Sequence, residues 1–150
     1  MRQEIADALK QAMRAQEARA TSTLRLILAA LKDRDIAARS KGQSEGISDD
    51  DILSMLQTMI KQRKESIALY EQGGRLELAE SEQEEIDVIA RFLPSQLNDE
   101  EIAAAVGEVI AETGAASLKD MGAVMGTLRE RYPGRMDFAK ASAQAKAQLR

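Results

Sequence analysis

Residues 48–74 read SDDDILSMLQTMIKQRKESIALYEQGG, and this stretch decides the fold class. Apolar side chains recur along it every three or four residues, which is the spacing of one face of an α-helix. That face consists of Ile52, Met55, Leu56, Met59, Ile60, Ile67 and Tyr70, with Arg63 in the same stripe. Ser48 followed by Asp51 has capping-box spacing, and Gly73 with Gly74 is typical of a helix end. The stretch therefore predicts one long amphipathic helix with its methionines in the core.

The same helical spacing recurs on both sides of this stretch. Further helices are expected over about 2–18, 24–39 and 76–93, and then from Asn98 to Gly114, from Ser117 to Arg131 and from Asp137 onward. Thr21, Ser22 and Thr23 offer N-caps for the helix over 24–39, in which Leu24, Leu26, Ile27, Leu28 and Leu31 are expected to point inward. Strand-favouring residues are sparse, with aromatic residues at 3%. The sequence predicts an all-α fold.

Pro94 interrupts the helical pattern and cannot continue a helix interior. It separates four expected helices from three, and the connections are short enough to favour antiparallel neighbours. We therefore expect an N-terminal four-helix bundle over residues 1–94 and a C-terminal three-helix bundle over residues 95–150.

The composition removes several classes of chemistry. The chain has no Cys and no His, so it lacks disulfides, thiolate nucleophiles, the usual proton-transfer group and the commonest metal ligand. The carboxylates near Glu82 and Glu85 are interpreted as a solvated helix face rather than a metal or catalytic pair, because a dinuclear site also needs His partners. We expect no intrinsic catalysis, no cofactor and no bound metal. The charged N-terminal stretch and the absence of a long apolar segment predict a cytoplasmic protein without a membrane span.

Two groups of charged residues are candidates for binding. The first is Lys61, Arg63, Ser66, Arg75 and Glu82, for which a structural role (with Arg63 in a partly buried ion pair) and an anion-binding role both stay open. The second is Lys119, Arg129, Arg131, Arg135, Lys140 and Lys146, which could contact a phosphate backbone without reading bases or could be ordinary solvated helix faces. Gly134 in the same region would let the backbone come close to a partner.

Four segments carry a resemblance to a known family. They are TLRLILAALKDRDI at 23–36, KQRKESIALYEQGGRLELAESEQEEIDVIARFLPSQL at 61–97, MGAVMGTLRERYPGRMD at 121–137, and the last helix. In order and spacing they resemble the GatB/YqeY family over essentially the whole chain. The resemblance implies a multihelical fold with a larger N-terminal bundle and a three-helix bundle after it. It also implies kinship with the C-terminal tail of the B subunit of glutamine-dependent aminoacyl-tRNA amidotransferase, a tail that helps hold the tRNA elbow.

The family label of carbon–nitrogen ligase activity with glutamine as amide donor would require an activated Ser or Cys nucleophile, an ATP-phosphate site and metal ligands. The sequence displays none of these groups, so the label is interpreted as ancestry and association. The first hypothesis is a noncatalytic module that binds tRNA or accompanies a tRNA-processing protein, with residues 119–146 as its RNA-binding edge. The alternative is a protein-interaction adaptor without RNA binding, which would use an exposed apolar patch near Met121 and Met125.

Overall fold

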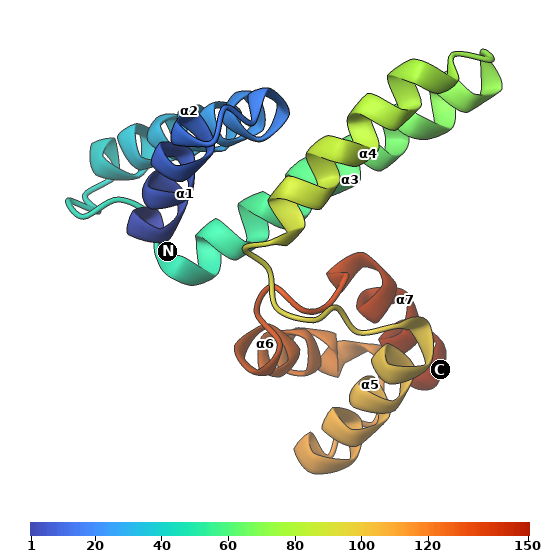
Figure 1. Cartoon of the computed structure of the whole chain (residues 1–150). Helices are drawn as coiled ribbons and strands as arrows, with labels where there is room; N and C mark the ends of the chain where they lie inside the picture. The colour runs from blue at the N-terminus through green and yellow to red at the C-terminus, as the bar shows by residue number, and fades with distance from the viewer. The chain divides into compact units, whose positions relative to one another are not determined.

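The computed structural model describes residues 1–150 and is entirely helical, with no strand (Figure 1). The α-helices are α1 (Arg2–Arg14), α2 (Ala18–Ser40), α3 (Asp49–Gln72), α4 (Leu76–Ala90), α5 (Asp99–Thr113), α6 (Met121–Arg131) and α7 (Phe138–Gln148). A short 3-10 turn, η1 (Leu118–Asp120), leads into α6. The predicted all-α fold class is confirmed. The chain divides into two compact units, Met1–Leu93 with four helices and Pro94–Arg150 with three.

Several of the expected helix ends follow their local signals. Ser48 accepts a hydrogen bond from the backbone N–H of Asp51, and three aspartates occupy the first turn of α3, at the positive end of its dipole. Asn98 and Glu101 form a full capping box at the start of α5. Asp137 caps α7 through the backbone N–H groups of Ala139 and Lys140. These three predicted starts are confirmed.

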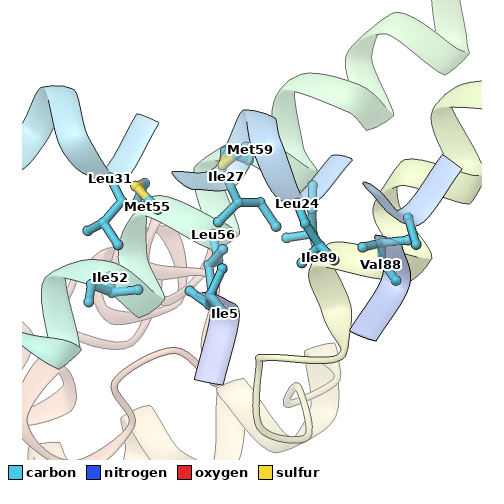
Figure 2. Close-up of a cluster of buried hydrophobic side chains, with 12 residues drawn as sticks. Ile5, Leu24, Ile27, Leu31, Ile52, Met55, Leu56, Met59, Val88 and Ile89 are labelled. Atoms are coloured by element: carbon cyan, nitrogen blue, oxygen red, sulfur yellow. The ribbon is translucent and has the colours of Figure 1, made fainter. Parts of the chain in front are cut away.

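The first unit is built around a core that all four helices share. Side chains from the four helices meet there: Ile5 from α1, Leu24, Ile27 and Leu31 from α2, Ile52, Met55, Leu56 and Met59 from α3, and Val88 and Ile89 from α4 (Figure 2). Placing these apolar side chains out of water is the main favourable term in the stability of the unit. The predicted core positions of Met55 and Met59 are confirmed.

The α3–α4 hairpin extends past this core as a two-helix arm (Figure 1). The core side chains of α3 end at Met59, and those of α4 begin at Val88. Beyond them, α3 and α4 pack on each other, Arg19 of α2 reaches Ser81 and Glu84 of α4, and Leu69, Leu76 and Leu78 are exposed. Gly73 and Gly74 make the turn, where Gly74 takes a left-handed backbone with φ +70°.

The second unit packs α5, α6 and α7 around a separate core. Its largest fully buried side chains are Ile102, Val106 and Val109 from α5, Leu128 from α6, and Met136 from the α6–α7 connection. Small alanines of α7, Ala141 and Ala145, complete the core and allow the helices to approach closely. Most of the large side chains in this core therefore come from α5 and α6.

The junction of α1 and α2 differs from the prediction. The first helix ends at Arg14 rather than near residue 18, because Gln16 adopts a left-handed backbone with φ +57°. The second helix begins at Ala18, so Thr21, Ser22 and Thr23 are interior helical residues and not caps. Starting the helix earlier does not bring Leu26 into the core; that side chain is 46% exposed because the buried face is set by Leu24, Ile27 and Leu31.

No helix in the chain combines the length and the apolar content that crossing a bilayer requires.

Candidate nucleic-acid interface

Four of the six predicted phosphate-contacting residues lie around the connection between α6 and α7. Arg129 and Arg131 are in the last turn of α6, Arg135 is in the connection, and Lys140 is in the first turn of α7. We call these four residues the basic corner. Arg129, Arg131 and Lys140 are exposed, and Arg135 is half-buried. The fold thus brings the four residues of the basic corner to one connection, which the sequence alone does not show.

The connection is held in place by the segment that enters the second unit, residues 94–97. The backbone N–H of Leu97 donates to the carbonyl of Arg135 at 2.8 Å. The Gln96 amide donates to the carbonyl of Gly134 at 2.5 Å, and Nε of Arg135 donates to the carbonyl of Ser95 at 3.0 Å. The guanidinium of Arg135 therefore positions the connection as well as carrying charge.

These bonds also correct the expectation for Gly134. Its backbone has φ +73°, which favours glycine, but the residue is buried and its carbonyl accepts from Gln96. Gly134 therefore serves the turn and does not open the backbone to a partner.

The guanidinium of Arg129 lies over the ring of Phe138, 5.8 Å from its centroid. This distance is within the range of a cation–π contact, and the ring is the first residue of α7. The contact directs the Arg129 side chain across the α6–α7 junction while leaving it exposed to solvent.

The other two cations of the basic corner pair with carboxylates of α5. Arg131 forms an ion pair with Glu112, and Nζ of Lys140 lies 3.0 Å from Oδ1 of Asp99. The hydrogen bond to Asp99 raises the pKa of Lys140, and the bond to Glu112 raises the pKa of Arg131. Both pairs are exposed, and exposed ion pairs in water are weak and screened by salt. A phosphate group can therefore replace the carboxylate in either pair.

Lys119 and Lys146 lie away from the basic corner. Lys119 is in η1, at the opposite end of α6, and Lys146 is in the last turn of α7. Both are exposed and neither forms an ion pair within the chain. They can add to the positive field of the unit without sharing one contact point with the other four.

The group from residues 61 to 82 does not converge on one site. Arg63 reaches from α3 to α4, where its Nε lies 3.0 Å from Oε2 of Glu85, and its Nη1 donates to the carbonyl of Met59 at 3.0 Å. Both side chains of this pair are largely buried, at 14% and 18% exposure. Glu85 was not among the candidate residues, because the sequence does not reveal which turn of α4 faces Arg63.

The remaining members of that group are spread along the arm. Lys61 is exposed, and the hydroxyl of Ser66 donates to the carbonyl of Gln62 in its own helix. Arg75 is exposed at the start of α4, while Glu82 is half-buried. The structure thus provides an ion pair at Arg63 and no common anion site for the rest.

Met121 and Met125 do not themselves form the exposed apolar patch expected near them, although Leu118, three residues before Met121, is 46% exposed. Met125 is 6% exposed within the second core, and Met121 is half-buried against the same core. Both methionine side chains face inward because they belong to the one apolar stripe of α6, and this stripe packs against α5 and α7. These two methionines therefore do not supply the surface for the adaptor alternative, which stays a prediction.

No group of three or more acidic side chains is placed so that it could hold a metal ion. Glu82 and Glu85 lie three residues apart on one side of α4, and Glu85 is not part of a solvated face as expected, because its carboxylate pairs with Arg63.

Comparison with known proteins finds one family and two relatives. The family described as Yqey-like protein matches residues 2–149. An uncharacterized protein of Schizosaccharomyces pombe is 30% identical over 91 residues, which cover 61% of this chain and 70% of that protein. Altered inheritance of mitochondria protein 41, mitochondrial, of Lachancea thermotolerans is 33% identical over 107 residues, which cover 69% of this chain. The match spans only 54% of that second relative's length.

Proposed function

The chain belongs to the YqeY-like protein family, and from that premise we propose that it is a noncatalytic tRNA-binding module associated with glutamine-dependent tRNA amidation. The contact we propose is between the basic corner of the second unit and the phosphate backbone of the tRNA. The association with an amidotransferase follows from the resemblance to the tail of its B subunit. Ligase chemistry would belong to the partner enzyme.

The observation that carries this proposal is the gathering of Arg129, Arg131, Arg135 and Lys140 at one connection. Residues 119–150 hold seven basic and three acidic side chains, whereas α5 holds five acidic side chains and no basic one. The positive charge of the unit is therefore concentrated on α6 and α7. Cations on rigid helix ends that release their counterions to a phosphate backbone provide affinity without reading sequence.

The proposed contact predicts a modest and salt-dependent affinity. With about three or four phosphates neutralised, the logarithm of the binding constant should fall with the logarithm of salt concentration with a slope of about −3. Binding should depend little on tRNA identity, because no side chain of the basic corner is required to contact a base edge. The test is fluorescence anisotropy of labelled tRNA with the full chain over a series of salt concentrations.

Two matched charge reversals identify the surface. Arg129→Glu with Arg131→Glu should weaken binding at low salt by a factor of about ten or more, since two phosphate contacts become repulsive. Lys61→Glu with Lys64→Glu changes the net charge equally on the arm of the first unit and should alter affinity by less than about twofold. Arg135 is left intact because it also holds the Ser95 carbonyl. Circular dichroism checks that both variants stay folded.

The absence of salt-sensitive tRNA binding at low ionic strength would refute the proposal. Equal losses in the two double variants would refute the basic corner as its site. Recovery of partners from cells, with and without RNase, tests the association: a partner retained through RNA is lost after RNase treatment, and a directly bound enzyme subunit is kept.

A further inference from the structure

Helix α2 presents a partly apolar outward face that nothing in the first unit covers. Leu26 and Ile36 are 46% and 54% exposed, and Ala29 and Asp33 lie between them on the same face. The spacing of three, four and three residues aligns these four positions along one side of the helix. Two large aliphatic side chains in one exposed stripe can contact another helix.

A row of basic side chains runs along one edge of this stripe. Arg25, Lys32 and Arg39 follow one another at intervals of seven residues, and all three are exposed. Arg25 and Lys32 form no ion pair, and Arg39 donates only to the carbonyl of Ser44. In a pair of helices, charges at this position beside the apolar seam select a partner of opposite sign.

Helix α4 presents the opposite charge at the same spacing. Glu80 and Asp87 are exposed and seven residues apart, on the side of α4 opposite the buried Ile89. Glu80 forms no ion pair, and Asp87 accepts only from the neutral amide of Gln83. Leu76, 66% exposed, adds an apolar side chain at the start of this face.

We propose that two copies of the chain associate through these faces, with α2 of each copy lying on α4 of the other. A seven-residue interval measures about 10.5 Å along a helix, so Arg25 and Lys32 can meet Glu80 and Asp87 of the other copy at the same time. With Lys32 opposite Glu80 and Arg25 opposite Asp87, the two helices run antiparallel, and the exposed Leu76 of one copy lies opposite the exposed Ile36 of the other, where they can pack together. The contact occurs twice in the pair, since a two-fold arrangement repeats every contact.

A second copy fits this surface better than a nucleic acid does. Phosphates would satisfy the basic row but would leave Leu26 and Ile36 in contact with water or with a charged backbone. A helix that carries carboxylates beside an apolar side chain can pair with the basic row of α2 and can also pack on its apolar stripe. Helix α4 of the first unit is a helix of this kind. The proposal is independent of tRNA binding, because it uses the first unit and not the basic corner.

The test is sedimentation velocity of the RNA-free full chain at low salt, in a concentration series up to about 1 mM, where weak interfaces become populated. The mass should rise from 16.4 kDa toward twice that value. Arg25→Glu with Lys32→Glu should abolish the association, and so should Glu80→Lys with Asp87→Lys, since each places like charges together in both contacts. The Lys61→Glu and Lys64→Glu variant, with the same change of net charge as the first, should still associate.

Mixing the two reversed variants gives the sharpest result. In the mixed pair both contacts again join opposite charges, so the mass should return to that of two chains although neither variant associates alone. The recovery also shows that each variant is folded. The basic-corner variant Arg129→Glu with Arg131→Glu should associate normally, which separates this proposal from the tRNA-binding one. A chain that remains single at every concentration, an association unaffected by the reversals, or a mixture that stays monomeric would each overturn the proposal.

Discussion

Arg2 and Asp35 stand 33 residues apart in the chain and form a two-pronged ion pair. Nη2 of Arg2 lies 2.6 Å from Oδ1 of Asp35, and Nε lies 3.2 Å from Oδ2. The same Nη2 donates to the carbonyl of Ile47 at 2.6 Å, while the N–H of Ile47 donates to Oδ1 of Asp35 at 2.9 Å. One buried carboxylate thus ties the start of α1, the second half of α2 and the loop before α3 together.

This carboxylate should make the stability of the first unit sensitive to acid. The hydrogen bond from Arg2 lowers the pKa of Asp35 below its ordinary value of 3.8. The unfolded chain therefore takes up the proton first, so the stabilisation is complete above about pH 5 and is lost as the pH falls through 3.8 toward the lowered pKa. Asp35→Asn should cost about 2 kcal/mol at neutral pH, less than for a fully buried pair because Arg2 is 37% exposed.

The measurement is urea unfolding of the natural chain and of Asp35→Asn over a series of pH values. The difference in unfolding free energy should be constant near neutrality and should shrink in acid. A difference that stays the same down to the lowest pH would contradict the pairing. Asp33→Asn, at an exposed position of the same helix, should have little effect throughout.

Gly46 should be far less tolerant of alanine than Gly42. Both have positive φ, +86° and +95°, so each alanine stores a similar backbone strain of about 1 kcal/mol. At Gly46, however, a Cβ would lie 2.3 Å from Oδ1 of Asp35, whereas at Gly42 no atom lies within 4 Å. Gly46→Ala should therefore cost about 2 kcal/mol more than Gly42→Ala, because it also disturbs the Arg2–Asp35 pair. Urea unfolding of the two variants measures this, and equal costs would show that the loop can move aside.

Adjacent glutamates of α4 should differ in their contributions. Glu85 pairs with Arg63 where both are largely buried, whereas Glu84 pairs with Arg19 at 48% and 50% exposure. Glu85→Ala leaves a partly buried guanidinium without its charge partner and should cost about 1–2 kcal/mol. Glu84→Ala should cost about 0.5 kcal/mol or less. Thermal or urea unfolding compares them directly, and Glu85→Gln should fall between the two because it keeps one hydrogen bond.

Replacing the hydroxyl of Thr23 should stabilise the protein. Thr23 is fully buried in the first unit, and its Oγ1 has no hydrogen-bond partner. Valine has nearly the same shape and removes the unsatisfied group, so Thr23→Val should raise the free energy of unfolding by about 1 kcal/mol. The matched control is Thr21→Val, at a half-buried position of the same helix, where the change should be near zero. A loss of stability in Thr23→Val would indicate that the hydroxyl has a partner.

The helices could be predicted where their signals are local. The stripe over residues 52–70 and the caps at Ser48, Asn98 and Asp137 depend on neighbours within one or two turns, and the structure keeps them. The α1–α2 junction could not be predicted in the same way. Gln16 adopts a left-handed backbone although no glycine or proline near it signals a helix end. The packing of Leu24 and Ile27 on the shared core favours this bend.

The candidate site shows the same division between local and distant information. The sequence supplied the basic residues of 119–146, and their helices follow from local pattern. It did not reveal that Arg129 lies on Phe138, that Arg135 holds the Ser95 carbonyl, or that Glu112 and Asp99 already pair with two of the cations. These partners are separated along the chain, and no periodicity connects them.

By itself the sequence determined that this protein is helical, where most helices start, and which side chains are available for binding. The tertiary structure alone decided which of those side chains meet: Arg63 with Glu85 rather than Glu82, Arg2 with Asp35, and four cations at one connection. The physical reason is that helix formation is set by contacts three or four residues apart, whereas the register between two helices is set by how their buried faces fit together.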